Sequence, residues 1–315
     1  MKKILYIFAC IVCAGCSLNE IHELDQEFRL MFQPGMYMHV SSAGVEDFPA
    51  QQNIGVCAWH LPEAKDSVKD LAGATPYLDM AEAHSQTMVE KPAAHSPGDM
   101  LWVVDDEAWM VDATPVAFMA YAPYQMPCQC NATDGITCHV DLQKDQTDLL
   151  YTDPHTIKQH TTLGWMVPLM FKHALAQIQF RVCHRVMPAE KIIVKSITLD
   201  SLKYQGNFAS LREPQWTTEG EYAPFTYYDD QFSAGIQPKR IGKGQLVVPQ
   251  KLNTRVRIEY DYVTAEGNVV PIVEYTEKVT THLKSSNTYI YTLSIGRGDV
   301  KFQLENIAHH FDTTE

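Results

Sequence analysis

The sequence predicts an all-β protein built from two β-sandwich domains in tandem, and three features of the chain support this prediction. Short segments with apolar residues at every second position recur along its 315 residues, separated by residues that favour turns. Segments with helical periodicity are few, and the sequence shows no internal repeat. The alternation also changes phase once, near the middle of the chain. Short strands at such intervals, without helices between them, are typical of β-sandwiches.

The change of phase lies within residues 162–182, the densest apolar stretch after the N-terminus. Because side chains alternate across a strand with a period of two, a slip indicates a bulge, a bend or a strand that leaves one sheet to enter another. The slip falls at His173, so we expect one domain over residues 30–163 and a second over 164–315. A helix over 171–182 is the alternative, which the polar residues at 177, 179 and 181 disfavour. The apolar positions are Trp165, Val167, Leu169 and Phe171 before the slip, and Ala174, Ala176, Ile178, Phe180 and Val182 after it.

Further strands are expected on both sides of this segment. The clearest covers residues 256–262, where apolar and charged residues alternate as in an antiparallel strand with one buried face. Others are expected near residues 36–40, 54–58, 115–124, 192–199, 269–279 and 289–295. Residues 61–99, which are poor in β-branched residues, predict a long irregular connection with one short helix. Residues 102–104 and 109–111 flank the acidic turn Asp105-Asp106-Glu107 and predict a hairpin.

The N-terminus predicts export. Lys2 and Lys3 precede a nine-residue apolar core, which is too short to span a bilayer, so residues 1–15 are expected to form a signal peptide. The following Cys13-Ala14-Gly15-Cys16 resembles the bacterial lipobox, although Cys13 stands where Leu is usual. The resemblance implies acylation, with palmitate-type chains, at Cys16. An ordinary secretory peptide is the alternative. Residues 16–29, polar and acidic, suit a tether or propeptide.

The charge of the chain argues against nucleic acid as a partner. Its 38 acidic and 25 basic side chains give a net charge of −13, which becomes −15 if residues 1–15 are removed. Such a surface repels phosphate backbones.

Five cysteines fall in the part expected to fold. They are an odd number, so in an oxidising compartment at least one remains a thiol or bridges to another chain. The string Cys128-x-Cys130 followed by Cys138-His139 suggests a zinc site. No second pair of zinc ligands follows at the usual spacing, so a disulfide or reduced cysteines are favoured. The five are Cys57, Cys128, Cys130, Cys138 and Cys183.

No motif in the sequence supports catalysis, a cofactor or a metal site. The nucleophile elbow, phosphate-binding loop, dinucleotide fingerprint and zinc-protease motifs are all missing. His173 is expected to be a structural histidine of an apolar strand, and His309-His310 a solvated tail. Arg297-Gly298-Asp299 spells an integrin-binding tripeptide, but a turn that needs glycine explains it more simply.

Several strings in the chain resemble the fimbrillin family of Bacteroidales fimbrial subunits. The string DLLY at residues 148–151 and VPLMFKHALAQIQFRV at 167–182 are similar to a DLLY-like string and a strand of the form φ-x-F-x-H-A-L-A-x-I in that family. FPAQQNIGVCAWHLPE at 48–63, PVAFMAYAPY at 115–124 and LVVPQ at 246–250 resemble further family strings. The resemblance implies two transthyretin-like (Ig-like) sandwiches exported as a lipoprotein, with no enzymatic activity.

The resemblance also implies a mode of assembly. In the family, an outer-membrane protease removes an N-terminal segment, and a terminal strand of the next subunit fills the groove that opens. Here the removable segment would end near Arg29, the only Lys or Arg between Cys16 and Met36. His309-His310-Phe311 stands where members often have a Trp, so an anchor, tip or accessory subunit is as plausible as a stalk subunit. The donor strand would present Val300, Phe302, Leu304 and Ile307.

The resemblance further implies a fimbrium on the outer membrane, other fimbrial subunits as partners, and host or bacterial surface ligands for adhesion. A surface glycan-binding lipoprotein is the alternative, and it requires an exposed aromatic platform. A hydrolase with paired carboxylates in a deep cleft is a third hypothesis. The aromatic candidates for the platform are Trp102, Trp109, Trp216 and Tyr227-Tyr228.

Overall fold

The computed structural model describes residues 29–37, 48–62, 71–87, 100–108, 115–157, 166–211, 213–308 and 311. This part of the chain contains strands and turns and no helix, as the sequence predicts. Consequently, none of the described elements is a helix long and apolar enough to cross a membrane. The strands are β1 (Arg29–Met36), β2 (Ile54–His60), β3 (Thr75–Thr87), β4 (Met100–Ala108), β5 (Val116–Ala122), β6 (Cys128–Asn131), β7 (Gly135–Asp141), β8 (Leu150–Thr152), β9 (His155–Ile157), β10 (Met166–His173), β11 (Ala176–His184), β12 (Lys191–Leu202), β13 (Gln205–Ala209), β14 (Gln215–Glu219), β15 (Ala223–Ser233), β16 (Lys239–Val247), β17 (Lys251–Thr254), β18 (Val256–Val263), β19 (Val269–Tyr275), β20 (Val279–His282), β21 (Thr288–Ile295) and β22 (Val300–Ala308).

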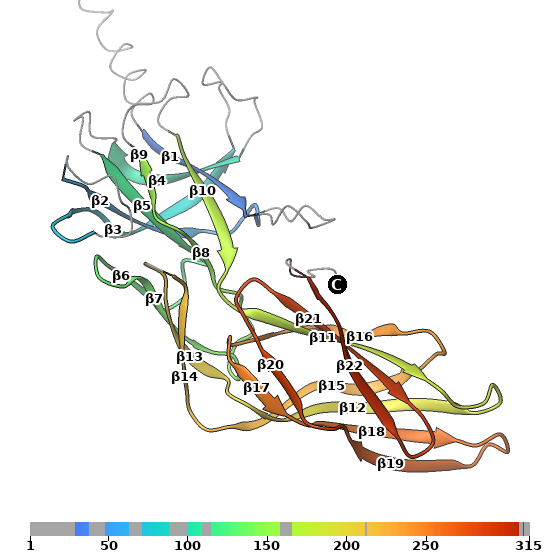
Figure 1. The fold of residues 1–315 in the computed structure, drawn as a ribbon. Coiled ribbons are helices and arrows are strands. Elements are labelled where there is room, and N and C mark those ends of the chain that lie inside the picture. The colour runs from blue at the N-terminus through green and yellow to red at the C-terminus, as the bar shows by residue number, and fades with distance from the viewer. Residues whose placement is uncertain are drawn as a thin grey trace, which may run out of the picture. The chain divides into compact units, whose positions relative to one another are not determined.

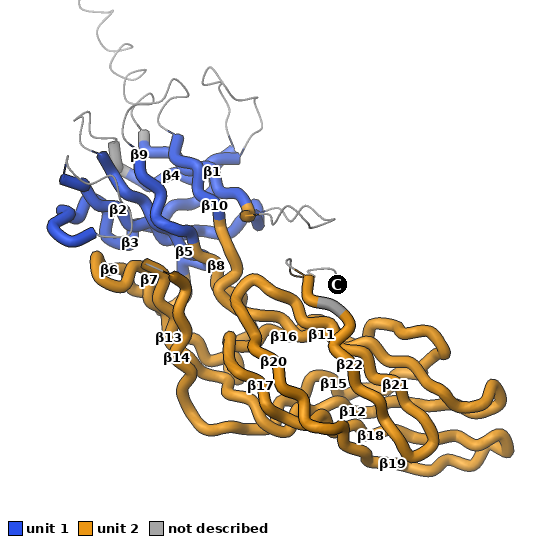
Figure 2. Tube along the Cα trace, viewed as in Figure 1, with its two compact units in different colours: residues 1–35, 48–124, 152–170 blue, residues 36–47, 125–151, 171–315 orange. Residues whose placement is uncertain are grey.

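The chain forms two compact units, which do not follow one another simply along the sequence (Figure 2). Unit 1 takes residues 1–35, 48–124 and 152–170, and unit 2 takes 36–47, 125–151 and 171–315. Residues 125–151, which the sequence analysis places in the first domain, thus belong to unit 2. The reason is strand pairing, since β7 within this segment pairs with β13.

The sheet of unit 1 closes on itself. Its strand order is β2-β3-β4-β1-β10-β8-β5-β9, and β2 also pairs with β5 (Figure 1). A sheet closed in this way has fewer free edges than the two-layered sandwich that the sequence suggests. At the seam, Gly55 of β2 pairs with Tyr121 of β5, and a Cβ on Gly55 would lie 2.2 Å from the Tyr121 ring. Only glycine therefore fits beneath this ring.

Two expectations for unit 1 are wrong. The region expected to be irregular contains β3, a strand of 13 residues, which pairs with both β2 and β4. Pairing with these two neighbours stabilises a strand that the local composition does not favour. The expected turn at residues 105–107 is also wrong, because β4 runs through these positions. Trp109 and Trp165 lie outside the described residues.

Unit 2 contains the sandwich that the sequence predicts. The sheets β16-β11-β21-β22 and β15-β12-β18-β19 both contribute to one apolar core. In β18 the alternation is confirmed, because Val256, Ile258 and Tyr260 are buried and the residues between them are partly exposed. Two smaller sheets, β14-β13-β7-β6 and β17-β20, complete the unit.

The phase slip marks a change of sheet, which was one of its predicted explanations. β10 belongs to the eight-stranded sheet and ends at His173, whereas β11 begins at Ala176 and belongs to a four-stranded sheet. Both segments are strands, so the helical alternative for residues 171–182 is wrong.

Candidate functional site

The last strand, β22, carries the four residues that the sequence analysis proposes as a donor strand. It pairs antiparallel with β21, and the register places Val300 opposite Ile295, Phe302 opposite Leu293, Leu304 opposite Tyr291 and Ile307 opposite Tyr289. The register shifts between Ile290 and Tyr291, so one extra residue enters β22 between residues 304 and 306. This bulge explains the spacing of three between Leu304 and Ile307, and it keeps all four side chains on the core face.

Burial decreases along β22 toward its C-terminal end. Val300 and Phe302 pack against the core, and the Phe302 ring stacks on Tyr291 with 4.9 Å between ring centroids. Leu304 and Ile307 lie on the same face but remain 36% and 40% exposed. Among the described strands, β22 is hydrogen-bonded to β21 alone and lies at the margin of its sheet (Figure 1). The strand is therefore an edge whose apolar row extends beyond the core it helps to cover.

Ion pairs hold the turn that precedes β22. Arg297 pairs with Glu190, and its Nε donates to the hydroxyl of Tyr262 at 2.7 Å. Arg185 Nη2 donates to Asp299 Oδ2 at 2.6 Å. Hydrogen bonds from Tyr262 and Arg297 hold the pKa of Glu190 below its ordinary value. Gly298 between them has a φ of 71°, so the predicted need for glycine at this turn is confirmed. Both charged side chains of the tripeptide thus form ion pairs within the same chain while remaining 63% and 52% exposed. These ion pairs favour a structural role for the turn over an integrin ligand.

Beyond β22, Phe311 holds the chain close to the start of β11. Its side chain is only 4% exposed, and its ring stacks on His173 with 3.8 Å between centroids. His173 is buried, and its Nδ1 contacts Asp148 Oδ2. The N–H of Ala174 donates to Leu149 O at 2.8 Å. The DLLY and HAL strings thus meet in space, and the prediction of a satisfied structural histidine is confirmed.

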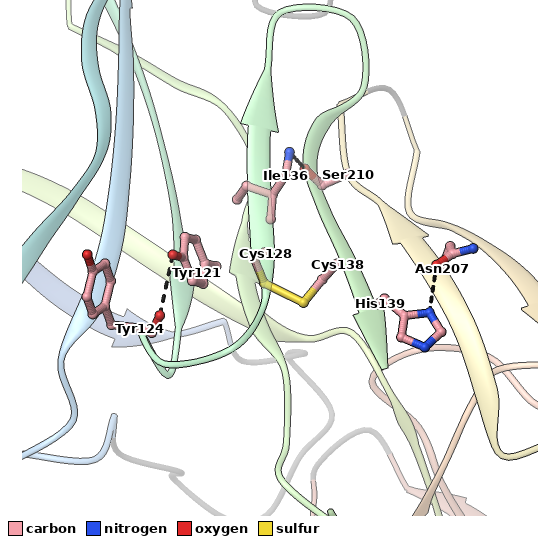
Figure 3. Close-up of a disulfide and its surroundings, with 8 residues drawn as sticks. All are labelled: Tyr121, Tyr124, Cys128, Ile136, Cys138, His139, Asn207 and Ser210. Carbon is pink, nitrogen blue, oxygen red and sulfur yellow. Dashed lines mark hydrogen bonds between the residues drawn. A yellow bond between two sulfur atoms is a disulfide. The ribbon is translucent and has the colours of Figure 1, made fainter. Parts of the chain in front are cut away.

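The cysteines of the C-x-C string do not form a zinc site with Cys138. Cys128 and Cys138 form a disulfide across the β6–β7 hairpin (Figure 3), whereas Cys130, two residues further along β6, is not part of it. Cys57 and Cys183 are buried outside any disulfide. No group of three or more His, Cys, Asp or Glu in the described ranges is arranged to hold a metal ion. The disulfide agrees with an oxidising compartment.

A shallow depression lies over the sheet β14-β13-β7-β6 of unit 2. Its volume is about 440 Å³, and its lining combines apolar surface with amide, hydroxyl and imidazole groups, including His139 and Asn207, which are joined by a 2.9 Å hydrogen bond (Figure 3). The lining contains no pair of carboxylates such as glycoside hydrolysis requires.

The aromatic platform that glycan binding requires is not formed by the described candidates. Trp102 is 4% exposed and donates its Nε1–H to Gln52 O, and Tyr227 is buried and donates to Ile241 O. Trp216 donates to Ala174 O at 2.8 Å and packs on Phe208. Tyr228 is partly buried against the core. The third tryptophan candidate, Trp109, lies outside the described residues.

The proposed N-terminal sites are described only in part. Cys16 lies outside the described residues, and Arg29 is the first residue of β1. Leu30 and Phe32, which follow it, are fully buried. Sequence reasoning missed the partners Arg185, Glu190 and Tyr262, because nothing in their local sequence marks them. The charges of Arg297 and Asp299 indicated only that oppositely charged partners could exist elsewhere in the chain.

Comparisons with known proteins agree with this structure. The model of the fimbrillin-like family matches residues 42–308. Fimbrium subunit Fim1C of Phocaeicola vulgatus is 25% identical over 201 residues, which cover 56% of this chain and 50% of that protein. The match therefore spans about half the length of this curated relative.

Solved structures resemble the fold over most of the chain. A fimbrial protein from Bacteroides vulgatus superposes with a TM-score of 0.60 at 15% identity, covering 88% of this chain and 98% of that one. A protein from Bacteroides ovatus, proposed to act in cell adhesion, gives a TM-score of 0.57 at 13% identity, covering 91% and 99%. At these identities the likeness shows the fold alone. Because the family model covers most of its length, the chain belongs to the fimbrillin-like family.

Proposed function

We propose that this protein is a structural or accessory subunit of a cell-surface fimbria, and that it joins neighbouring subunits by exchanging β22. The observation that carries the proposal is the apolar row of β22, a margin strand in a member of the fimbrillin-like family. Leu304 and Ile307 extend this row beyond the part that the core of the same chain covers. An apolar row on an edge strand is the feature that strand addition uses.

The surface beneath β22 suits the same strand from a second copy. If β22 left, β21 would become an edge with unpaired backbone groups, and the rings of Tyr291 and Phe180 would lose the Phe302 ring that packs against them. A second copy of β22 would restore both the hydrogen bonds and the ring contacts. Exchange would first require release of Arg297 and Asp299 from their ion pairs, so it would be slow without assistance.

The N-terminal region completes the proposal. Cleavage after Arg29 would leave Leu30 as the new terminus, so the buried residues of β1 would stay with the fold. Acylation of Cys16 would hold the precursor at the outer membrane before cleavage. The fimbria would then act in adhesion to host or bacterial surfaces.

The test is purification of the protein from its native cell surface, followed by denaturing gels with and without boiling. We expect ladders that collapse on boiling and an N-terminus at Leu30. Thr292→Cys/Gln303→Cys, at positions directly opposite one another on β21 and β22, should abolish the ladder when the pair is oxidised before assembly, because the disulfide then ties β22 to its own chain. The same variant kept reduced during assembly is the control and should give the ladder. A single band from the unaltered protein, or equal ladders from the oxidised and the reduced variant, would contradict strand exchange by β22.

A further inference from the structure

Strand β19 at the margin of unit 2 is the most apolar exposed edge in the described part of the chain. It lies beside β18 and is hydrogen-bonded to no other described strand (Figure 1). Val269, Val273 and Tyr275 are 58%, 51% and 52% exposed. By contrast, the margin strand β14 carries the polar sequence QWTTE, and β16 carries two lysines and one arginine. Natural proteins usually protect such edges with charges or proline. Pro271 blocks one position of β19, but no charged side chain interrupts its exposed apolar row, which indicates a contact surface.

The backbone of the same residues is turned toward the open side. At the two ends of the β18–β19 ladder, Thr276 N donates to Val256 O at 2.9 Å, and Thr264 N donates to Asn268 O at 2.9 Å. Bonding to β18 therefore uses the even-numbered residues of β19, because hydrogen-bonded pairs alternate in an antiparallel ladder. Val269, Val273 and Tyr275 direct their N–H and C=O groups outward. Pro271 lies in the same series and has no N–H to offer.

The charges beside this apolar row cancel one another. On β18, Arg257 pairs with Glu259, and Asp261 Oδ1 lies 2.8 Å from Lys195 Nζ of β12. Arg257, Glu259 and Asp261 lie opposite odd-numbered residues of β19. Lys195 lies on β12, the strand on the other side of β18. The chain as a whole carries a net charge of −13, which would repel another copy. The charged residue of β19 itself, Glu274, lies on the opposite, even-numbered face, where burial raises the pKa of its carboxyl. Beside the odd-numbered row the repulsion is therefore reduced, so a second copy can approach here.

We propose that β19 is a self-association surface, at which the β19 strands of two copies pair antiparallel about a twofold axis through Val273. In this register Val273 of each copy bonds with its counterpart. Tyr275 of each copy donates to the Pro271 carbonyl of the other, so the missing N–H of Pro271 removes only the reverse bond. The apolar rows of the two copies then form one continuous stripe. Such an isologous contact closes after two copies.

The contact is expected to be weak and reversible. One strand edge offers less than the roughly 800 Å² per partner of a stable interface, so we expect a dissociation constant on the order of 100 μM. This contact does not depend on exchange of β22. In a fimbria, however, identical weak contacts along two fibres would add up and hold the fibres side by side.

The test is sedimentation of the purified full chain over a concentration series around that value, in the oxidised Thr292→Cys/Gln303→Cys background, in which β22 is tied to its own chain and cannot exchange. We expect a monomer–dimer equilibrium that Val273→Lys weakens about tenfold or more, because the charge would lie at the centre of an apolar contact. Thr217→Lys on β14 changes the net charge equally and should leave the equilibrium unchanged. A monomer at all concentrations, or equal effects of the two substitutions, would overturn the proposal.

Site-specific photo-crosslinking distinguishes this contact from other occupants of the edge. A benzophenone side chain at position 275 should crosslink to the region of Pro271 in a second copy. The same group at position 222, where Tyr222 is 61% exposed, should give no dimer. Crosslinks from position 275 to another segment of either copy would show that a different strand covers β19, and would refute the pairing. Gel ladders report on β22 and sedimentation reports on β19, so the two proposals can fail separately.

Discussion

Shortening the core-facing side chains of β22 should cost progressively less stability toward its C-terminal end. Phe302 packs on Tyr291 and lies 6.2 Å from the Phe180 ring centroid, whereas Leu304 is 36% exposed at the sheet margin. Full burial makes Phe→Ala cost about 3–5 kcal/mol and Leu→Ala about 2–5 kcal/mol. Phe302 is partly buried, so we expect about 2–3 kcal/mol for Phe302→Ala. Leu304 leaves no enclosed cavity, so we expect about 1 kcal/mol for Leu304→Ala.

Urea unfolding followed by tryptophan fluorescence measures this difference. Trp216 is the only tryptophan in the sequence ranges of unit 2, so a protein whose other tryptophans are replaced by phenylalanine reports on that unit. The midpoint should fall clearly for Phe302→Ala and slightly for Leu304→Ala, with an unchanged slope. If Leu304→Ala lowers the midpoint as much as Phe302→Ala does, β22 is not held mainly at its turn end. The decrease of burial along β22 would then not correspond to a decrease in its contribution to stability.

Three further predictions concern the contacts that hold β22 and its unit. Glu190→Gln should lower the free energy of unfolding at neutral pH and flatten the acid limb of a stability–pH profile. The reason is that hydrogen bonds lower the pKa of Glu190 in the folded state. Its contribution to stability is therefore complete above the ordinary glutamate pKa of about 4 and is lost as pH falls below it. Phe311→Ala should lower the stability of unit 2 by about 1–2 kcal/mol and raise hydrogen exchange in β22, whereas unchanged exchange would show that Phe311 does not hold the strand. Reduction of the Cys128–Cys138 disulfide should cost about 2–3 kcal/mol in the same urea assay, because it closes a short loop with a sequence separation of 10, and the Cys128→Ser/Cys138→Ser protein should show no response to reductant.

Much of the candidate site follows from local patterns in the sequence. Val300, Phe302 and Leu304 alternate, and Ile307 completes their face once a bulge is allowed. The glycine of the Arg-Gly-Asp turn is where a turn needs it. The partners of that turn could not be predicted, because Arg185 and Glu190 are more than 100 residues away and carry no local signal. The pairing of Asp148 with His173 joins two strings 25 residues apart, and only the fold shows why they occur together.

The sequence by itself determined the all-β class, the interruption of the strand pattern at His173 and the resemblance to the fimbrillin family. These features depend on side-chain alternation and on short strings of residues, which can be recognised without knowledge of long-range contacts. Tertiary structure alone decided that residues 125–151 join unit 2, that β3 forms in a segment of low β propensity, and that β19 is an exposed edge. The physical reason is that strand neighbours are chosen by long-range hydrogen bonding and shared burial. Neither the order nor the composition of the residues in a strand specifies which edge is left open.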